Sequence, residues 1–193
     1  MKPLAVHGGA AATVFSVCAA GWVAFELALA IHVRGGLARH PSLLPLALSL
    51  VAGVALADFV ARGVDGLALP GPGWWPVAIW AAVIAVGLAL RAWAVHELGR
   101  FFKFTVVVQA DHRVVDTGPY RVIRHPSYTG LLMAELGLGI MLGTWLSIPA
   151  ALLPPLVAFG VRINREERVL ACGLGEPYRA YMARTHRLVP GVW

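Results

Sequence analysis

The sequence is poor in charged residues. Asp, Glu, Lys and Arg make up 13% of its 193 residues, against the ~25% that is usual for a soluble domain. Lysine is especially rare, with two Lys against fourteen Arg. Hydrophobic residues reach 59% of the chain and gather in long runs. This composition excludes an ordinary soluble domain and predicts a protein that crosses a membrane.

Cysteine is also scarce, which limits the chemistry that the chain can support. Cys18 lies in the first apolar run and Cys172 in the polar C-terminal segment, so we expect no mutual disulfide and no metal site. The first apolar run lacks a small-residue cleavage pattern at its end, so no cleavable signal peptide is expected. The formal net charge of +6 does not indicate a nucleic-acid partner, because the basic residues lie in short segments between apolar runs.

Three apolar runs have the length of membrane-spanning helices, near the ~20 residues that cross ~30 Å of hydrocarbon. They cover residues 10–32, 43–61 and 74–95. A further stretch, residues 129–161, is too long for one untilted span and is interrupted by TWLSIP at 144–149 and by Pro154-Pro155. We expect two helices there, joined by a tight turn. The predicted fold is an all-α integral membrane protein with about five transmembrane helices.

We expect a single domain over residues 1–193, with three helices in residues 1–95 and a polar loop, a helical hairpin and a C-terminal helix in residues 96–193. Basic residues orient it. Twelve of them fall in 91–124 and 162–187, whereas only Lys2 and Arg62 lie on the opposite side. Because basic loops stay in the cytoplasm, we expect the N-terminus outside and the C-terminus in the cytoplasm. The arginine-rich, lysine-poor usage suggests a GC-rich gene and hence a bacterial cell membrane.

Two polar segments contain the side chains that are suited to chemistry. In GPYRVIRHPSYTG, residues 118–130, His125 precedes Pro126 and so is biased towards an extended backbone at the end of a loop. In the tail, Arg162 and Glu166 lie four residues apart on one helical stripe. Each segment alone is compatible with a simpler interpretation, a loop on lipid head groups and an amphipathic juxtamembrane helix.

Together, the two segments resemble the isoprenylcysteine carboxyl methyltransferase family, which belongs to a wider group with the phospholipid N-methyltransferases. HRVVDTGPYRVIRHPSYTG is similar to the family's pattern of a His, two apolar residues, Gly-x-Tyr and then Arg-His-Pro-x-Tyr-x-Gly. EERVLACGLGEPYRAY is similar to its Glu-Glu-x-x-Leu followed by Gly-x-x-Tyr-x-x-Tyr. The resemblance covers roughly residues 96–190.

The resemblance implies an integral membrane enzyme that uses S-adenosylmethionine, bound in a cytoplasmic pocket that the loop and the C-terminal helix close. Matched by motif, the expected cofactor-binding residues are Gln109, His112, Val115, Tyr120, Arg124, His125, Pro126, Ser127, Tyr128 and Glu166. Arg162 is expected to meet the carboxylate of the acceptor, and Arg162 and Glu167 are the expected catalytic residues. No metal is expected.

Ionisable residues within apolar spans are further candidates, because such groups are costly in hydrocarbon and usually face a cavity or a partner. Glu135 is a candidate substrate contact, unless it lies close enough to the interface to stay hydrated. Glu26 is a weaker candidate, and Arg91 is expected to extend to the cytoplasmic face. Gly139 and Gly143 indicate close helix packing rather than a nucleotide-binding loop, since no strand precedes them.

The methyl acceptor stays open. Prenylcysteine carboxyl O-methylation is the family's named reaction, but bacteria generally lack prenylated proteins, so a lipid-soluble carboxylate, amine or thiol is equally compatible. Membrane lipids are the other expected partners, and no oligomeric state is indicated. Two other classes are possible. Membrane sterol reductases share a similar Arg-His-x-x-Tyr-x-Gly but bind a nicotinamide cofactor and have Asn where Ser127 stands, and a non-catalytic membrane scaffold could have kept the fold.

Overall fold

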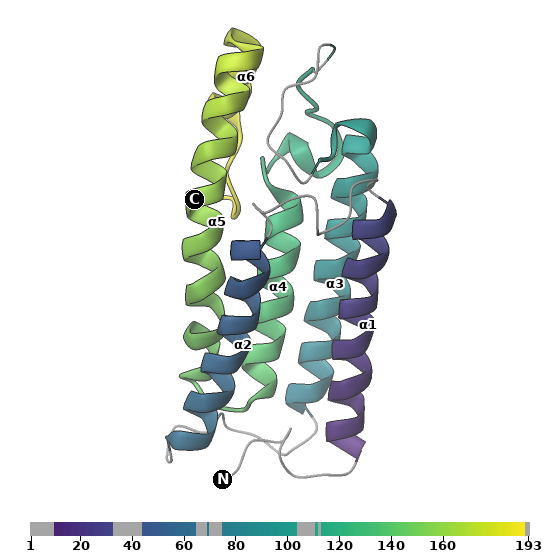
Figure 1. Cartoon of the computed structure of the whole chain (residues 1–193), viewed down its shortest axis with the longest axis vertical. Helices are drawn as coiled ribbons and strands as arrows, with labels where there is room; N and C mark the ends of the chain where they lie inside the picture. Colours follow the sequence, from purple (N-terminus) through teal and green to yellow (C-terminus); the bar gives the residue numbers. More distant parts are fainter. Residues whose placement is uncertain are drawn as a thin grey trace.

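The computed structural model describes residues 10–32, 44–64, 69, 75–103, 111 and 113–191. Five long helices run side by side in an elongated bundle (Figure 1). They are α1 (Ala10–His32), α2 (Leu44–Gly63), α3 (Trp75–Leu98), α4 (Pro126–Met141) and α5 (Ser147–Leu174). Three short elements lie at one end of the bundle, namely the 3-10 turns η4 (Gly99–Phe101) and η5 (Gly118–Arg121) and the helix α6 (Glu176–Arg184). The described residues form no strand, which confirms the all-α prediction.

The long helices expose apolar side chains to their surroundings, as helices surrounded by lipid must. Three described segments are long and apolar enough to cross a membrane, namely Leu44–Gly63, Val77–Phe101 and Ser147–Leu174. Large apolar side chains are exposed on their outer surfaces, among them Phe59 on α2 and Val157 on α5. These observations agree with an integral membrane protein. The helices α1 and α4 run alongside the three spans, and the count of five spans stays a prediction.

The stretch after residue 126 folds as the predicted hairpin. Gly143, in the turn between α4 and α5, has φ +74°, a left-handed conformation that glycine adopts without strain. The Ser147 hydroxyl then donates a hydrogen bond to the Gly139 carbonyl at 2.7 Å, and a Cβ on Gly139 would lie only 2.9 Å from Ile148 Cα. Gly139 therefore packs closely against α5 as expected, whereas Gly143 serves the turn and not a helix contact.

The prediction that Pro154-Pro155 interrupt this stretch is wrong, because both prolines lie inside α5. Pro155 has no N–H, so the Ala151 carbonyl one turn earlier loses its helical donor. Gly53 of α2 packs against that carbonyl, and a Cβ on Gly53 would also lie 3.3 Å from Pro155 Cδ. The proline pair is thus accommodated where a glycine of the neighbouring helix approaches the backbone.

The helices α3 and α4 touch through a pair of glycines. A Cβ on Gly87 would lie 2.6 Å from the Gly130 carbonyl oxygen and 3.0 Å from Met133 Cβ. A Cβ on Gly130 would meet both the Gly87 carbonyl and Arg91. The glycine that ends RHPSYTG is therefore required by helix packing, since no larger residue fits between the two backbones.

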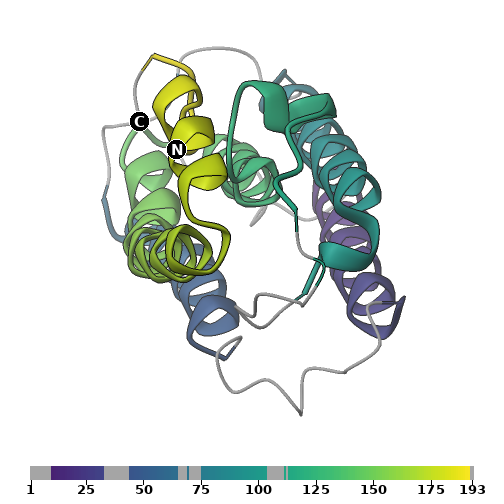
Figure 2. The ribbon, with the colours of Figure 1, turned by 90° about the horizontal axis from the view of Figure 1, so that it is seen from above.

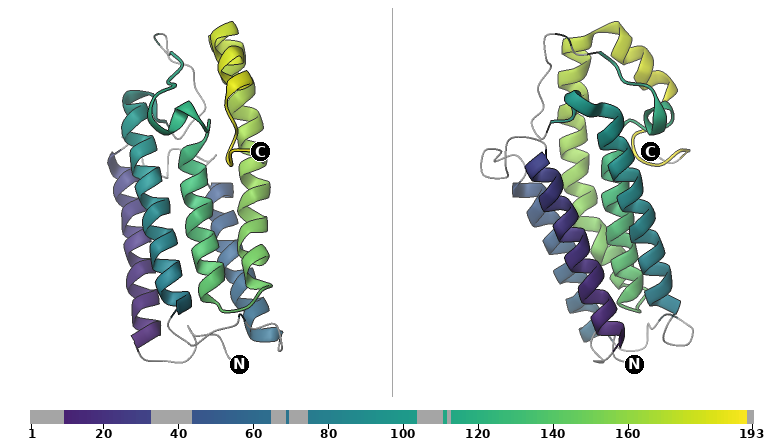
Figure 3. Two further views of the ribbon diagram at one scale, coloured as in Figure 1. Left: turned by 180° about the vertical axis from the view of Figure 1, so that it is seen from behind. Right: turned by 90° about the vertical axis from the view of Figure 1, so that its right-hand side faces the viewer.

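The loop before α4 and the C-terminal segment meet at the same end of the bundle, as predicted. Gly175, with φ +66°, ends α5, and α6 then lies across the top of the bundle (Figure 3). From there the chain returns beside the start of α4 (Figure 2). The Arg124 N–H donates to the His186 carbonyl at 2.7 Å, and the His186 N–H donates to the Val122 carbonyl at 2.9 Å. Backbone hydrogen bonds thus fix the tail to the loop.

The α3–α4 contact gives a first prediction. Gly130→Ala should lower the apparent melting temperature in detergent, because overpacking of a close contact costs about 1–3 kcal/mol. The matched control is Gly21→Ala on α1, where an added Cβ meets nothing within 4 Å, so the melting temperature should not fall. Equal melting temperatures for both variants would contradict the packing role of Gly130.

Candidate active site

The polar end of the bundle encloses a cavity of about 570 Å³, within the ~300–1,000 Å³ typical of small-molecule sites. Its wall changes with depth. Polar side chains from the loop and from α5 line the mouth, and apolar side chains from α1, α2 and α4 line the inner part. Leu50 and Leu138 represent that inner part. One cavity therefore offers both a polar and an apolar compartment.

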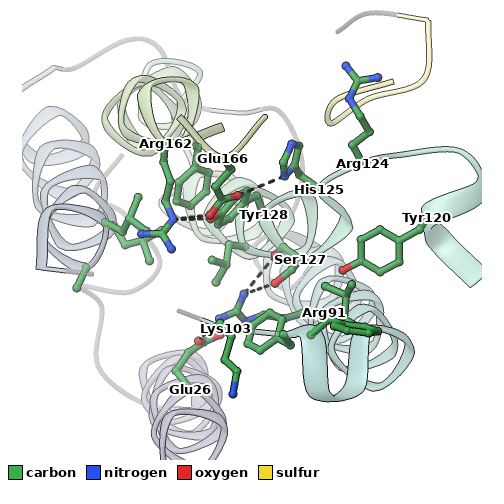
Figure 4. A pocket seen from close by; sticks show the side chains of 18 of the residues that line it. Glu26, Arg91, Lys103, Tyr120, Arg124, His125, Ser127, Tyr128, Arg162 and Glu166 are labelled. Carbon is green, nitrogen blue, oxygen red and sulfur yellow. Dashed lines mark hydrogen bonds and ion pairs between the residues drawn. The ribbon is translucent and has the colours of Figure 1, made fainter. Parts of the chain in front are cut away.

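One wall of the mouth is a cluster of four side chains from the start of α4 and the second half of α5, which we call the α4–α5 cluster: His125, Tyr128, Arg162 and Glu166 (Figure 4). Arg162 Nε lies 2.6 Å from the Tyr128 hydroxyl oxygen and 2.9 Å from Glu166 Oε1. The Tyr128 hydroxyl donates to Glu166 Oε1 at 2.8 Å. His125 Nδ1 lies 3.6 Å from Glu166 Oε2. The expected i, i+4 pair of Arg162 and Glu166 is thus present, but it lines a cavity, with Arg162 buried and Glu166 partly buried.

The opposite wall contains an ion pair that joins three helices. Arg91 of α3 donates from Nη2 to Glu26 of α1 at 2.6 Å and from Nη1 to the Ser127 hydroxyl of α4 at 2.6 Å. Arg91 is 5% exposed and lines the cavity, so the expectation that it extends to the cytoplasmic face is wrong. A guanidinium that far from water needs an anionic partner, and Glu26 supplies it.

Aromatic rings complete the mouth. Tyr120 of η5 lines the cavity, and its hydroxyl donates to the Ala94 carbonyl at 3.3 Å. Burial raises the pKa of the Tyr120 phenol, so the hydroxyl stays neutral. The Tyr128 ring stacks on Phe159 with their centroids 4.9 Å apart. Phe101 lies on the α3 side of the same mouth. These rings give the polar compartment flat apolar faces.

Glu167 does not line the cavity, and both of its oxygens are engaged. Arg124 Nε donates to Oε1 at 2.8 Å, and Arg187 Nη2 lies 2.8 Å from Oε2. His125 Nε2 lies 3.4 Å from Oε1. Arg124 lines the cavity, but its guanidinium points towards the C-terminal segment (Figure 4), where it donates to the Met182 carbonyl at 2.9 Å. We call this arrangement the Glu167 clamp.

Most of the residues predicted for the site meet in one place. Nine of them line the cavity: Val115, Tyr120, Arg124, His125, Ser127, Tyr128, Glu135, Arg162 and Glu166. Pro126 is buried behind the wall as the first residue of α4, and Glu167 lies in the clamp. Gln109 and His112 lie outside the described residues. Sequence reasoning gave too little weight to Glu26 and Arg91, although their charge within apolar runs could have indicated a cavity.

Comparison with known proteins finds relatives of this chain. Residues 80–172 match the model of the isoprenylcysteine carboxyl methyltransferase (ICMT) family. Protein-S-isoprenylcysteine O-methyltransferase B of Arabidopsis thaliana is 29% identical over 172 residues, 87% of this chain and 86% of that protein. A probable protein-S-isoprenylcysteine O-methyltransferase of Oryza sativa subsp. indica is 30% identical over 119 residues, 61% of this chain and 62% of that protein.

A solved structure is also similar. It is that of the eukaryotic intramembrane Ras methyltransferase ICMT without a monobody, with a TM-score of 0.57 and 27% sequence identity. The match covers 77% of this chain and 52% of that one, so the present chain spans about half the length of the solved protein.

The Glu167 clamp gives a second prediction. Glu167→Gln should lower the melting temperature and expose the tail to trypsin, because two arginines lose a buried anion, and breaking a buried pair costs about 3–5 kcal/mol. Asp116→Asn, which removes the exposed partner of Arg184, is the control and should leave both measurements unchanged. A stable variant that loses only catalytic turnover would instead support the predicted catalytic role of Glu167.

Proposed function

We propose that this chain, which is similar to the isoprenylcysteine carboxyl methyltransferase family over residues 80–172, transfers a methyl group from S-adenosylmethionine to a lipophilic acceptor at the membrane. The proposed reaction is most like carboxyl O-methylation of a prenylcysteine-type carboxylate. One observation carries the proposal: a single cavity joins the polar α4–α5 cluster to an apolar compartment between membrane helices. Such a cavity suits a charged cofactor and a lipid-soluble acceptor side by side.

The polar compartment fits S-adenosylmethionine, which carries an ammonium group, a carboxylate and an adenine ring. Glu166 can hold the ammonium group, because a carboxylate has about four acceptor positions and only some are used by Tyr128 and Arg162. Arg91 Nε is buried and has no hydrogen-bond partner among the described residues, so it is available to the cofactor's carboxylate. The rings of Tyr120 and Phe101 suit adenine. When bound, the cofactor supplies an electrophilic methyl group.

A carboxylate acceptor is already ionised at neutral pH and requires no general base. It requires a cation that holds it in line with the methyl group, so catalysis depends mainly on positioning and on the exclusion of water. Arg162 suits this role because Tyr128 and Glu166 fix its buried guanidinium. His125 contributes indirectly, since it contacts Glu166 and Glu167 with its two ring nitrogens.

The acceptor enters the cavity sideways from the bilayer, between α1 and α2. Three side chains of these helices line the cavity and are also more than half exposed: Val23 at 56%, Leu27 at 55% and Val51 at 65%. A residue that has both properties marks an opening of the cavity onto the outer surface. Seen from above, α1 and α2 stand apart from each other (Figure 2).

The polar mouth faces the cytoplasm in this proposal, with the N-terminus outside, and the membrane is a bacterial cell membrane. Six basic residues of the 91–124 region and six of the 162–187 region support this orientation, since they belong to the end of the bundle where the loop and the tail meet. A cytoplasmic mouth also gives direct access to soluble S-adenosylmethionine.

The assignment of Glu166 to the cofactor gives a third prediction. Glu166→Ala should weaken the binding of S-adenosylhomocysteine by about 100-fold or more, because a charge-assisted hydrogen bond in a buried site contributes about 1.5–3 kcal/mol and Tyr128 and Arg162 lose their shared acceptor as well. Calorimetric titration measures it, with the exposed Glu176→Ala as control. Wild-type affinity in Glu166→Ala, or binding of NADPH in place of S-adenosylhomocysteine, would contradict the proposed function.

The role of Arg162 gives a fourth prediction. Arg162→Lys keeps the charge but loses the planar fork, so kcat/KM for N-acetyl-S-farnesylcysteine should fall by about 10–100-fold, with a smaller change in S-adenosylhomocysteine affinity. Arg165→Lys is the control, because Arg165 is exposed and does not line the cavity. Equal kcat/KM in the two variants would remove Arg162 from the acceptor site.

A further inference from the structure

A carboxyl group without a partner lies in the apolar compartment of the cavity. Glu135 of α4 is fully buried at 0% exposure, and it lines the cavity. Neither of its carboxyl oxygens has a hydrogen-bond partner among the described residues. The same stripe of α4 carries Leu131 and Leu138, one turn to either side, and both line the cavity too.

Helix packing does not require a carboxyl group at this place. Burying a carboxyl group without a partner costs free energy, and a hydrophobic residue of similar volume is usually neutral or more stable at such a position. Residues that lower stability, such as a buried polar group without a partner, tend to lie at functional sites. Trp22 of α1 has a similar character, since its indole Nε1 is buried without a hydrogen-bond partner among the described residues and its side chain lines the same cavity.

The position of Glu135 relates it to the reacting end of the acceptor. Tyr128, Leu131, Glu135 and Leu138 recur at the spacing of one helical face, and all four line the cavity. Glu135 follows Tyr128 by seven positions, which corresponds to about 10 Å along the helix axis at ~1.5 Å per residue. An acceptor whose methylated group lies at the α4–α5 cluster therefore has its hydrocarbon portion beside Glu135.

We propose that Glu135 binds a hydrogen-bond-donating group of the acceptor, a hydroxyl or an amine, about 10 Å from the methylated atom. The preferred acceptor is then a lipophilic molecule with a second polar group, bound more tightly than one whose isoprenoid chain carries no polar group. The proposal rests on the proposed function for the place of methyl transfer. Its physical basis is selectivity: a site with a buried hydrogen-bonding group rejects a ligand that leaves the group unpaired.

Three probes test this assignment by their dissociation constants, measured calorimetrically without turnover. They are N-acetyl-S-farnesylcysteine and two analogues that carry a hydroxyl or an amino group about 10 Å from the carboxylate. The wild-type protein should bind each analogue at least about tenfold more tightly than the plain compound. Glu135→Leu should lose or reverse this preference. Glu135→Gln should keep the preference for the hydroxyl but lose much of that for the amine, because it retains an acceptor oxygen without the charge.

Controls separate binding from folding. Glu135→Leu should melt at the wild-type temperature or higher and keep its affinity for S-adenosylhomocysteine, and Asp58→Asn, on α2 and outside the cavity, should keep the wild-type preference. Equal affinities for all three probes in the wild-type protein would overturn the proposal, as would a preference that survives in Glu135→Leu. If Glu135→Leu does not fold, an unchanged preference for the amine in Glu135→Gln overturns it.

The same measurements distinguish a failure of the proposed methyl transfer from a failure of the proposed role of Glu135. If the wild-type protein does not bind S-adenosylhomocysteine but shows the Glu135-dependent preference, the ligand assignment stands and methyl transfer is wrong. If it binds S-adenosylhomocysteine without that preference, methyl transfer stands and the role of Glu135 is wrong.

Discussion

Two adjacent carboxylates in the second half of α5, Glu166 and Glu167, hold the loop, the tail and the bundle together. Neighbouring residues of a helix point about 100° apart, so Glu166 faces the cavity while Glu167 faces the C-terminal segment. His125 lies between them, with Nδ1 3.6 Å from Glu166 and Nε2 3.4 Å from Glu167. The side chain of His125, which immediately precedes α4, therefore connects the cavity wall to the Glu167 clamp. Without the contacts of His125 with Glu166 and Glu167, the loop and the tail would not close the polar end of the cavity.

The cavity combines two opposite electrostatic situations. At its mouth, carboxylates and guanidinium groups are paired, as Arg162 with Glu166 and Arg91 with Glu26, so their desolvation is offset by short ionic contacts. Deeper in the bundle, Glu135 has no such partner among the described residues. The paired groups hold three helices and the tail in place, whereas the unpaired one does nothing for the fold. The paired residues therefore stabilise the cavity, whereas Glu135 is the residue that we propose binds the acceptor.

The sequence predicted the helices well because length and apolarity are local properties. The hairpin of α4 and α5 follows from a run too long for one span, but Pro154-Pro155 were misinterpreted because Gly53, about a hundred residues away, accommodates them. The meeting of His125 with Glu166 was expected from a family resemblance, and no local pattern required it. The pairing of Arg91 with Glu26, 65 residues apart, could not be predicted, since no local sequence pattern in either span indicates which residue of another helix it contacts. Likewise, periodicity alone does not tell which of Glu166 and Glu167 faces the cavity.

The half-exposed side chains of Val23, Leu27 and Val51 have a consequence for any measurement of activity. With the entry between α1 and α2 that we propose, the acceptor comes from the two-dimensional population of molecules in the bilayer and not from those dissolved in water. The relevant acceptor concentration is thus a mole fraction in lipid, and added detergent dilutes it while the total amount stays constant. Apparent KM values from micelles and vesicles become comparable only after conversion to that surface scale.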